Sequence, residues 1–234
     1  MQITRAAVII VYHGVLVDEV EIVRFVLSRI PDLRTVTAGP APGRVTGIGG
    51  VVTADASLDE IRRPAVVAVP GGIGSHLHAE IASWLRHVSP RWLLASSTGS
   101  ALLAASGRLQ DATASGHWLA GHLLERYGAH PSHQPVVVDG PIITCSSGPS
   151  AFRAALVIAE SYGGQELVTR IRADAATAPE EGHPAQNRSV WTRLRDAILR
   201  RDRRAEPAGA PIDQGVDEIE VLDLGLVKPR PPQS

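Results

Sequence analysis

The stretch WLLASSTGSALLA, residues 92–104, places a turn of small residues between two apolar segments. We predict that residues 92–97 form a buried strand and that residues 99–107 form the helix that follows it. A strand that breaks into such a turn and re-enters as a helix is typical of a nucleophile elbow, which exposes a reactive side chain at the end of a sheet. The hydroxyl side chains of this turn are therefore the first candidates for a nucleophile.

Apolar runs rich in Val, Ile and Leu alternate with helix-length amphipathic segments along most of the chain. Strands buried on both faces have this composition, and the alternation predicts a parallel sheet with helices on both sides. The predicted fold class is α/β, a three-layer α/β/α sandwich with a mostly parallel sheet. The other expected elements are strands at 6–12, 34–39 and 65–72, a hairpin at 135–147 turning on Asp139-Gly140, and helices at 18–30, 75–88, 117–127 and 149–162, the last ending at Gly163-Gly164.

Composition restricts the class of protein. The chain has 234 residues, 44% of them hydrophobic and 20% charged, as in a globular protein, and no run is long enough to span a membrane. The N-terminal apolar run has the length of a strand and lacks a cleavage site, so we expect a cytoplasmic location. The net charge of −1 gives no general reason to bind nucleic acid. One cysteine, Cys145, excludes an intramolecular disulfide and a zinc site built from several thiolates.

The composition changes near residue 176. We predict an α/β domain over 1–175, a linker over 176–187, a basic amphipathic helix over 188–204 and an acidic, disordered tail over 205–234. The basic segment has seven arginines and two aspartates, with Trp191 on its apolar face. It could bind nucleic acid or anionic lipid, but a single short helix supplies few phosphate contacts, and docking of its apolar face on the domain is the simpler interpretation.

Four stretches fall just beyond the carboxyl ends of predicted strands, where an open α/β sheet places its active site. They are HGVLVDEVE (13–21), VPGGIGS (69–75), ASSTGSALLA (95–104) and SGHW (115–118).

Two of these stretches carry groups that could assist a nucleophile. Asp18 and Glu19 open a helix, where acidic side chains also simply complement the helix dipole. The Gly-rich turn lacks the Walker and dinucleotide spacings, so it does not predict a nucleotide site. Because the turn and the elbow lie on neighbouring strands, the amides of Thr98 and of Gly72 or Ile73 are candidates for oxyanion stabilisation.

The histidines divide into two groups. His117 follows the strand after the elbow helix, and His13 follows the first strand, so both are expected at the pocket, with Trp118 as a wall or a packing anchor. The other histidines lack partners at metal-ligand spacing, so we predict no metal site and no cofactor.

The segments VVAVPGGIGS, LLASSTGSALLAASGRL, ATASGHW and VVVDGPIITCSSGPSAFRAALVIAESYGG occur in this order within residues 5–170. Together they resemble the ThiJ/PfpI superfamily, which includes isonitrile hydratases, the parkinsonism-associated protein and sensor domains of some AraC-type regulators. The resemblance implies a flavodoxin-like, class I glutamine-amidotransferase-like fold and a homodimer.

In that family the elbow normally carries a cysteine, and the resemblance places this position on Ser97. A thiolate is accessible near neutral pH, whereas a serine hydroxyl needs a general base within hydrogen-bond reach. The resemblance also places Glu19 on the family's acidic residue beside the elbow and His117 on a histidine that borders the pocket. Cys145 falls where the family has small residues, which implies a buried structural thiol.

Two functions stay open at this stage. The first is an enzyme that acts on a small electrophilic metabolite by hydration, lyase or hydrolytic chemistry, with Glu19 transferring a proton, Ser97 or an activated water as the nucleophile, and His117 assisting. The second is a ligand-binding or scaffolding protein that has lost the nucleophilic cysteine. A DNA-binding regulator is disfavoured because no pair of helix-turn-helix motifs follows residue 170.

Overall fold

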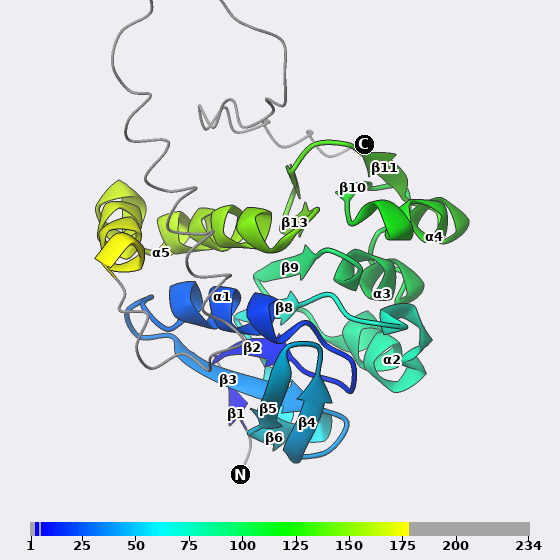
Figure 1. Cartoon of the computed structure of the whole chain (residues 1–234), viewed down its shortest axis with the longest axis horizontal. Coiled ribbons are helices and arrows are strands. Elements are labelled where there is room, and N and C mark those ends of the chain that lie inside the picture. Colours follow the sequence, from blue (N-terminus) through cyan, green and yellow to red (C-terminus); the bar gives the residue numbers. More distant parts are fainter. Residues whose placement is uncertain (1–2, 5, 178–234) are drawn as a thin grey trace, which may run out of the picture.

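The computed structural model describes residues 3–4 and 6–177, and a seven-stranded sheet runs through its centre (Figure 1). The strand order is β12-β13-β9-β8-β2-β3-β6, and every neighbouring pair is parallel except the antiparallel hairpin of β12 and β13. The bounds are β2 (Ala6–Ile10), β3 (Arg34–Gly39), β6 (Ala56–Ser57), β8 (Val66–Val69), β9 (Trp92–Ser96), β12 (Val136–Asp139) and β13 (Ile142–Cys145).

Helices cover both faces of the sheet and complete the predicted three layers (Figure 1). One face carries α1 (Val17–Leu27) and α5 (Gly148–Thr177), and the other carries α2 (Ala79–His87), α3 (Gly99–Ala105) and α4 (Gly121–Arg126). Three 3-10 helices lie at η1 (Leu58–Glu60), η2 (Ser75–Leu77) and η3 (Trp118–Ala120). Strand pairs outside the main sheet are β1 (Ile3–Thr4) with β7 (Ile61–Arg63), β4 (Gly43–Gly47) with β5 (Gly50–Ala54), and β10 (Thr113–Ser115) with β11 (His130–Ser132).

Most predicted elements are confirmed, and the largest difference lies in the last helix. That helix was expected to end at Gly163-Gly164, but helical structure resumes after a break at Gly164, whose φ of 63° and ψ of −168° are not helical, and continues to Thr177. The second half buries Leu167 and Ile171, and Arg29, two residues beyond the end of α1, forms a 2.9 Å ion pair with Asp174. Packing against α1 thus stabilises a segment that the glycine pair separates from the first half.

Two other expected helices are shorter and less regular than predicted. The segment 75–88 begins as η2 and becomes α2 only at Ala79, and the segment 117–127 begins as η3 before α4. The hairpin of β4 and β5 was not predicted, because its glycines and exposed residues lack the apolar alternation of a buried strand.

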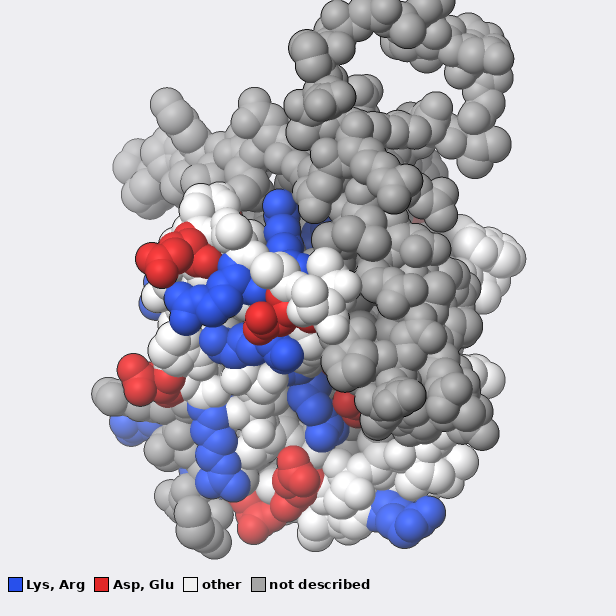
Figure 2. All heavy atoms as spheres, turned by 60° about the vertical axis from the view of Figure 1, so that its left-hand side comes forward, with Lys and Arg blue, Asp and Glu red and all other residues white. Residues whose placement is uncertain are grey.

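The core follows the apolar runs of the sequence. All five residues of β2 are buried, as expected for a central strand covered on both faces. Figure 2 shows acidic and basic side chains interspersed over the outer face that carries part of α1 and α5. Ion pairs on these helices join Arg24 to Glu21 and Arg170 to Glu166.

Among the described residues, none of the helices has the length and apolar character that crossing a bilayer requires. The predicted basic helix at 188–204 and acidic tail at 205–234 lie outside the described residues, as does the predicted linker from residue 178 on.

Candidate active site

The turn between β9 and α3 forms the predicted elbow, with Ser97 at its apex. Ser97 has a φ of 55°, a left-handed conformation that non-glycine residues seldom adopt and that costs of order 1–3 kcal/mol. Its N–H donates a 2.8 Å hydrogen bond to the carbonyl of Cys145 on β13, which anchors the turn to the neighbouring strand. Sheet anchoring thus holds the strained turn that presents the Ser97 side chain.

Close packing of α3 against β8 brings the elbow near the Gly-rich turn. A Cβ added at Gly99 would overlap the carbonyl oxygens of Val69 and Pro70, so only glycine fits at the start of this helix. A Cβ added at Gly71 would lie 3.1 Å from the Ser97 Oγ and 3.1 Å from the amide nitrogen of Thr98. The Ser97 hydroxyl therefore faces the backbone of the Gly-rich turn.

Glu19 lies in the first turn of α1 with its carboxyl group behind the elbow. Its side chain is only 4% exposed, and Oε2 accepts two hydrogen bonds, from the Gly71 N–H at 2.8 Å and from the Ser96 hydroxyl at 2.6 Å. A helix N-terminus often carries an acidic residue in solvent. Glu19 instead points into the protein, so the dipole interpretation does not account for its position.

Burial raises the pKa of Glu19 above its usual range. The hydrogen bonds from Ser96 and Gly71 act in the opposite direction, Asp18 raises the pKa further, and a hydrogen bond with Ser97 lowers it. The net direction is upward because desolvation is the largest of these effects. Glu19 therefore holds its proton at higher pH than an exposed glutamate and can serve as a proton donor.

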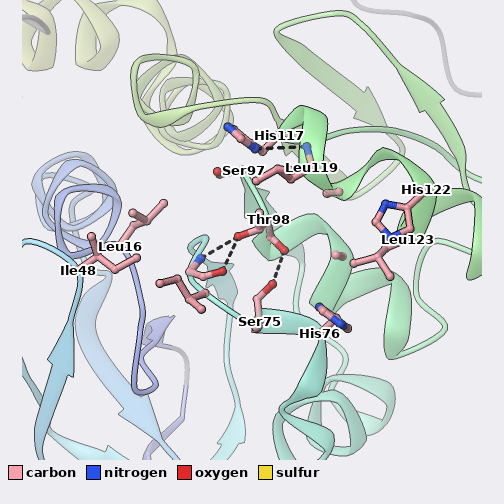
Figure 3. Close-up of a pocket in the computed structure, with 15 residues that line it drawn as sticks. Leu16, Ile48, Ser75, His76, Ser97, Thr98, His117, Leu119, His122 and Leu123 are labelled. Atoms are coloured by element: carbon pink, nitrogen blue, oxygen red, sulfur yellow. Dashed lines mark hydrogen bonds between the residues drawn. The ribbon is translucent and has the colours of Figure 1, made fainter.

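The Gly-rich turn is fixed to the elbow by a side chain. The Thr98 hydroxyl accepts a hydrogen bond from the Gly72 N–H and donates one to the Gly72 carbonyl, both at 2.8 Å (Figure 3). The Ile73 N–H donates to the Gly14 carbonyl at 3.0 Å. Two of the three amides expected to stabilise an oxyanion are thus engaged within the protein, and the Thr98 N–H has no hydrogen bond within residues 3–4 and 6–177.

A pocket of about 490 Å³ opens above the elbow (Figure 3). Ser97 and Thr98 line it, and His117 enters from the loop after β10. Most of the other lining is apolar or glycine: Leu16, Ile48, Gly72, Ile73, Gly74, Ala101, Leu119, Ala120 and Leu123, with Ser75, His76 and His122 as further polar members. Glu19 is not among the lining residues, but Ser97, which is hydrogen-bonded to the Glu19 carboxyl group, is one of them.

Exposed large apolar side chains occur in the segments that line this pocket. The described residues with large exposed apolar side chains are Ile48, Val51, Ile73, Leu77, Trp118 and Leu119. Three of them line the pocket, and each of the others lies within three positions of a lining residue along the chain. Ile73 is 73% exposed and Trp118 is 80% exposed, so these segments present apolar surface to solvent, as binding sites often do.

Of the other predicted site residues, His117 lines the pocket, whereas Trp118, His13 and Asp18 do not. His117 lines the pocket, but its Nδ1 accepts a 3.3 Å hydrogen bond from the Leu119 N–H, so in the neutral ring Nε2 carries the proton. The Trp118 ring lies beside the His117 ring at a centroid distance of 5.5 Å, and Trp118 is exposed and is not a lining residue. His13 is exposed and Asp18 lies on α1, and neither is a lining residue.

Sequence reasoning missed Ser96 and Tyr12. The Tyr12 hydroxyl donates a 2.8 Å hydrogen bond to the Pro70 carbonyl beneath the Gly-rich turn, and burial raises its pKa. Ser96 stands directly before the predicted nucleophile in a run of hydroxyl residues, and a polar residue at the end of an apolar strand was the available signal. Cys145 is fully buried, and burial raises the pKa of its thiol, consistent with a structural role.

Comparison with known proteins identifies relatives. The model of the DJ-1/PfpI family matches residues 5–161. An isonitrile hydratase of Pseudomonas putida is 30% identical over 119 residues, which is 49% of this chain and 52% of that protein, so the match spans about half of each.

Solved structures share the fold. A ThiJ/PfpI family protein from Pseudomonas syringae has a TM-score of 0.70 and 19% identity, covering 84% of this chain and 91% of that chain. DJ-1beta of Drosophila melanogaster has a TM-score of 0.66 and 23% identity, and the match covers 76% of this chain and 100% of that chain. An AraC family transcriptional regulator from Pseudomonas putida has a TM-score of 0.63 and 17% identity, and the match covers 73% of this chain and 98% of that chain.

Proposed function

Since this chain belongs to the DJ-1/PfpI family, we propose that it acts on a small electrophilic metabolite, with Glu19 as proton donor and Ser97 or a water as the nucleophile. Hydration, lyase and hydrolytic chemistry all fit this description, and hydration is the first of them to test. The observation that carries the proposal is the buried Glu19 carboxyl, which has a raised pKa and lies behind a strained serine at the floor of a pocket.

The pocket lining favours a neutral substrate with an apolar group. Within the described residues, the lining contains no arginine, lysine or carboxylate that would select a charged substrate. A cavity of this volume holds a small molecule whose apolar part contacts Leu16, Ile48 and Leu123 while its electrophilic atom reaches Ser97.

An isonitrile illustrates the proposed chemistry, and the Pseudomonas putida relative makes this class the first to test. The isonitrile carbon accepts a proton that Glu19 supplies through the Ser97 hydroxyl. An oxygen nucleophile, either water or Ser97, bonds to the same carbon, and the proton that it loses returns to Glu19. With water this gives R–N=CH–OH, whose hydroxyl proton moves to nitrogen to form the formamide, and with Ser97 it gives the imidate R–N=CH–O–Ser97. The net reaction is R–N≡C + H₂O → R–NH–CHO, and water hydrolyses the ester-like intermediate if Ser97 is the nucleophile.

Binding without turnover is the second candidate function. It is favoured because the Ser97 hydroxyl has no histidine base hydrogen-bonded to it among the described residues, and because Thr98 and Gly14 already occupy the amides of Gly72 and Ile73. A metabolite could then occupy the pocket as a ligand.

Substrate screening separates the two candidates. Full-length wild type, Ser97→Ala and Ser97→Cys are incubated with isonitriles, α-oxoaldehydes, activated esters and amides, and substrate loss is followed by mass spectrometry. Ser106→Ala, which removes another buried hydroxyl, is the control. Turnover by wild type that Ser97→Ala abolishes supports the serine. Turnover that survives in Ser97→Ala leaves a water as the nucleophile, and turnover only in Ser97→Cys supports the binding function.

Oligomeric state and location also stay proposals. We expect a homodimer, which light scattering at several concentrations tests, and a persistent monomer would contradict it. A cytoplasmic location is tested by fractionating cells that express the full chain.

A further inference from the structure

Ser96 differs from the rest of its strand in being polar where burial is nearly complete. It is 1% exposed at the end of β9, and the residues before it, Leu93, Leu94 and Ala95, are apolar and buried. A buried hydroxyl without a partner is destabilising, so the partner of this hydroxyl indicates its role. That partner is the Glu19 carboxyl, 77 positions away along the chain, at 2.6 Å.

The two donors at Glu19 differ in what a substitution can change. Gly71 donates from its backbone, so a substitution at Ser96 does not remove that donor, whereas the Ser96 hydrogen bond depends on the Ser96 side chain. Both donors contact Oε2. Oε1 receives neither of them, and Ser97 also interacts with this carboxyl group.

We propose that Ser96 is a positioning residue that holds Oε2 of Glu19 together with the Gly71 amide, so that Oε1 carries the transferable proton toward Ser97. This inference rests on the proposed role of Glu19 as proton donor. It assigns a function to the first serine of the elbow and separates that function from the second serine, which faces the pocket.

The surroundings of Glu19 show why a donor is useful there. The titratable neighbours are Asp18 on α1, Tyr12 after β2 and Cys145 on β13. Asp18 raises the pKa of Glu19, as burial does, and the pKa values of Tyr12 and Cys145 are raised in turn by burial and by Glu19. Without Ser96, Glu19 would bind its proton more firmly. With Ser96, the pKa of Glu19 is lower than burial alone would make it, so the carboxyl group gives up its proton more readily.

The test measures the titration of Glu19 directly in the full-length protein. Glutamate side chains are labelled with ¹³C at the carboxyl carbon, and the Glu19 resonance is identified as the one missing in Glu19→Gln. Ser96→Ala removes the donor, Ser96→Thr keeps a hydroxyl, and Ser96→Cys supplies a weaker one. Ser106→Ala is the control, because it removes a buried hydroxyl that donates to the Leu103 carbonyl and not to Glu19.

We expect Ser96→Ala to raise the pKa of Glu19 by about one to two units, since the hydrogen bond from Ser96 stabilises the ionised carboxylate. Ser96→Thr should restore the wild-type value, Ser96→Cys should give an intermediate one, and Ser106→Ala should leave it unchanged. If Ser96→Ala does not fold, the comparison of Ser96→Cys with Ser96→Thr decides. An unchanged Glu19 titration in folded Ser96 variants, or an equal shift in Ser106→Ala, would overturn the inference.

Turnover gives a second and separate readout. If the proposed function holds, the alkaline limb of the pH–rate profile moves upward with the pKa of Glu19 in Ser96→Ala. A shifted titration in a protein that turns over no substrate would support the positioning role and contradict the proposed function. A failure of the positioning role of Ser96 can therefore be distinguished from a failure of the proposed function.

Discussion

The Thr98 hydroxyl bridges both polar groups of the Gly72 backbone, accepting from its N–H and donating to its carbonyl at 2.8 Å each. This side chain joins the elbow after β9 to the Gly-rich turn after β8, and both turns line the pocket. The Thr98 hydroxyl therefore contributes to the geometry of the pocket floor, together with the Ser75 hydroxyl, which donates to the Thr98 carbonyl at 2.6 Å.

Replacing Thr98 by Val removes that hydroxyl while keeping the shape of the side chain. We expect the free energy of unfolding to fall by about 1–3 kcal/mol, because the Gly72 N–H and carbonyl lose their partner. Thr98→Ser keeps the hydroxyl, so its free energy of unfolding should fall by less than that of Thr98→Val. Urea unfolding of the three proteins measures both changes, and equal stability of wild type and Thr98→Val would show that the bridge contributes nothing.

Gly99→Ala tests the close packing of α3. The added methyl would overlap the carbonyl oxygens of Val69 and Pro70, so we expect a loss of several kcal/mol or failure to fold. Gly121→Ala is the matched control, because an added Cβ there meets nothing within 4 Å and alanine favours a helix by up to about 1 kcal/mol. Thermal unfolding of both variants provides the measurement. A Gly99→Ala protein as stable as Gly121→Ala would contradict the packing argument.

Glu19 should make folding stability depend on pH. Its folded pKa is raised above the unfolded value, so the stability that comes from the neutral carboxyl is present at low pH and is lost as pH rises through the folded pKa. The Glu19→Gln variant cannot ionise, so its stability relative to wild type should improve as pH increases. Urea unfolding across pH 5 to about 9 checks this. A constant difference between the two proteins over that range would mean that Glu19 is not held neutral.

Cys145 should be unreactive in the folded protein. Its thiol is fully buried, and burial and Glu19 raise its pKa, so little reactive thiolate forms at neutral pH. We expect no labelling by a thiol reagent under native conditions and full labelling in denaturant, with Ser97→Cys labelled faster than wild type in the folded state. Rapid native labelling of wild type would contradict the structural role of this thiol.

The sequence predicted the features that depend on local pattern. The buried strands and the elbow follow from apolar runs and small-residue turns, and Asp139-Gly140 correctly indicated the hairpin of β12 and β13. The continuation of α5 past Gly164 could not be predicted from the sequence. Glycine locally favours the end of a helix, and the helix continues because its second half packs against α1.

In the candidate site, too, the sequence predicted some features and could not predict those that depend on tertiary contacts. That Glu19 and Ser97 approach each other was expected only from the resemblance, since no local pattern relates residues so far apart in the chain. The hydrogen bonds of Ser96 and Thr98 depend on side-chain orientation at strand ends, which no spacing in the sequence specifies.

The most direct test of the central claim compares wild type with Glu19→Gln on the substrate class that wild type converts. The variant keeps the shape of the side chain and an acceptor for Ser96 and Gly71 but cannot supply the carboxyl proton. We predict that kcat/KM falls by at least about 100-fold, the usual contribution of a general acid, while substrate binding measured by calorimetry is retained. Wild-type turnover that persists unchanged in Glu19→Gln would contradict the account of Glu19 as proton donor.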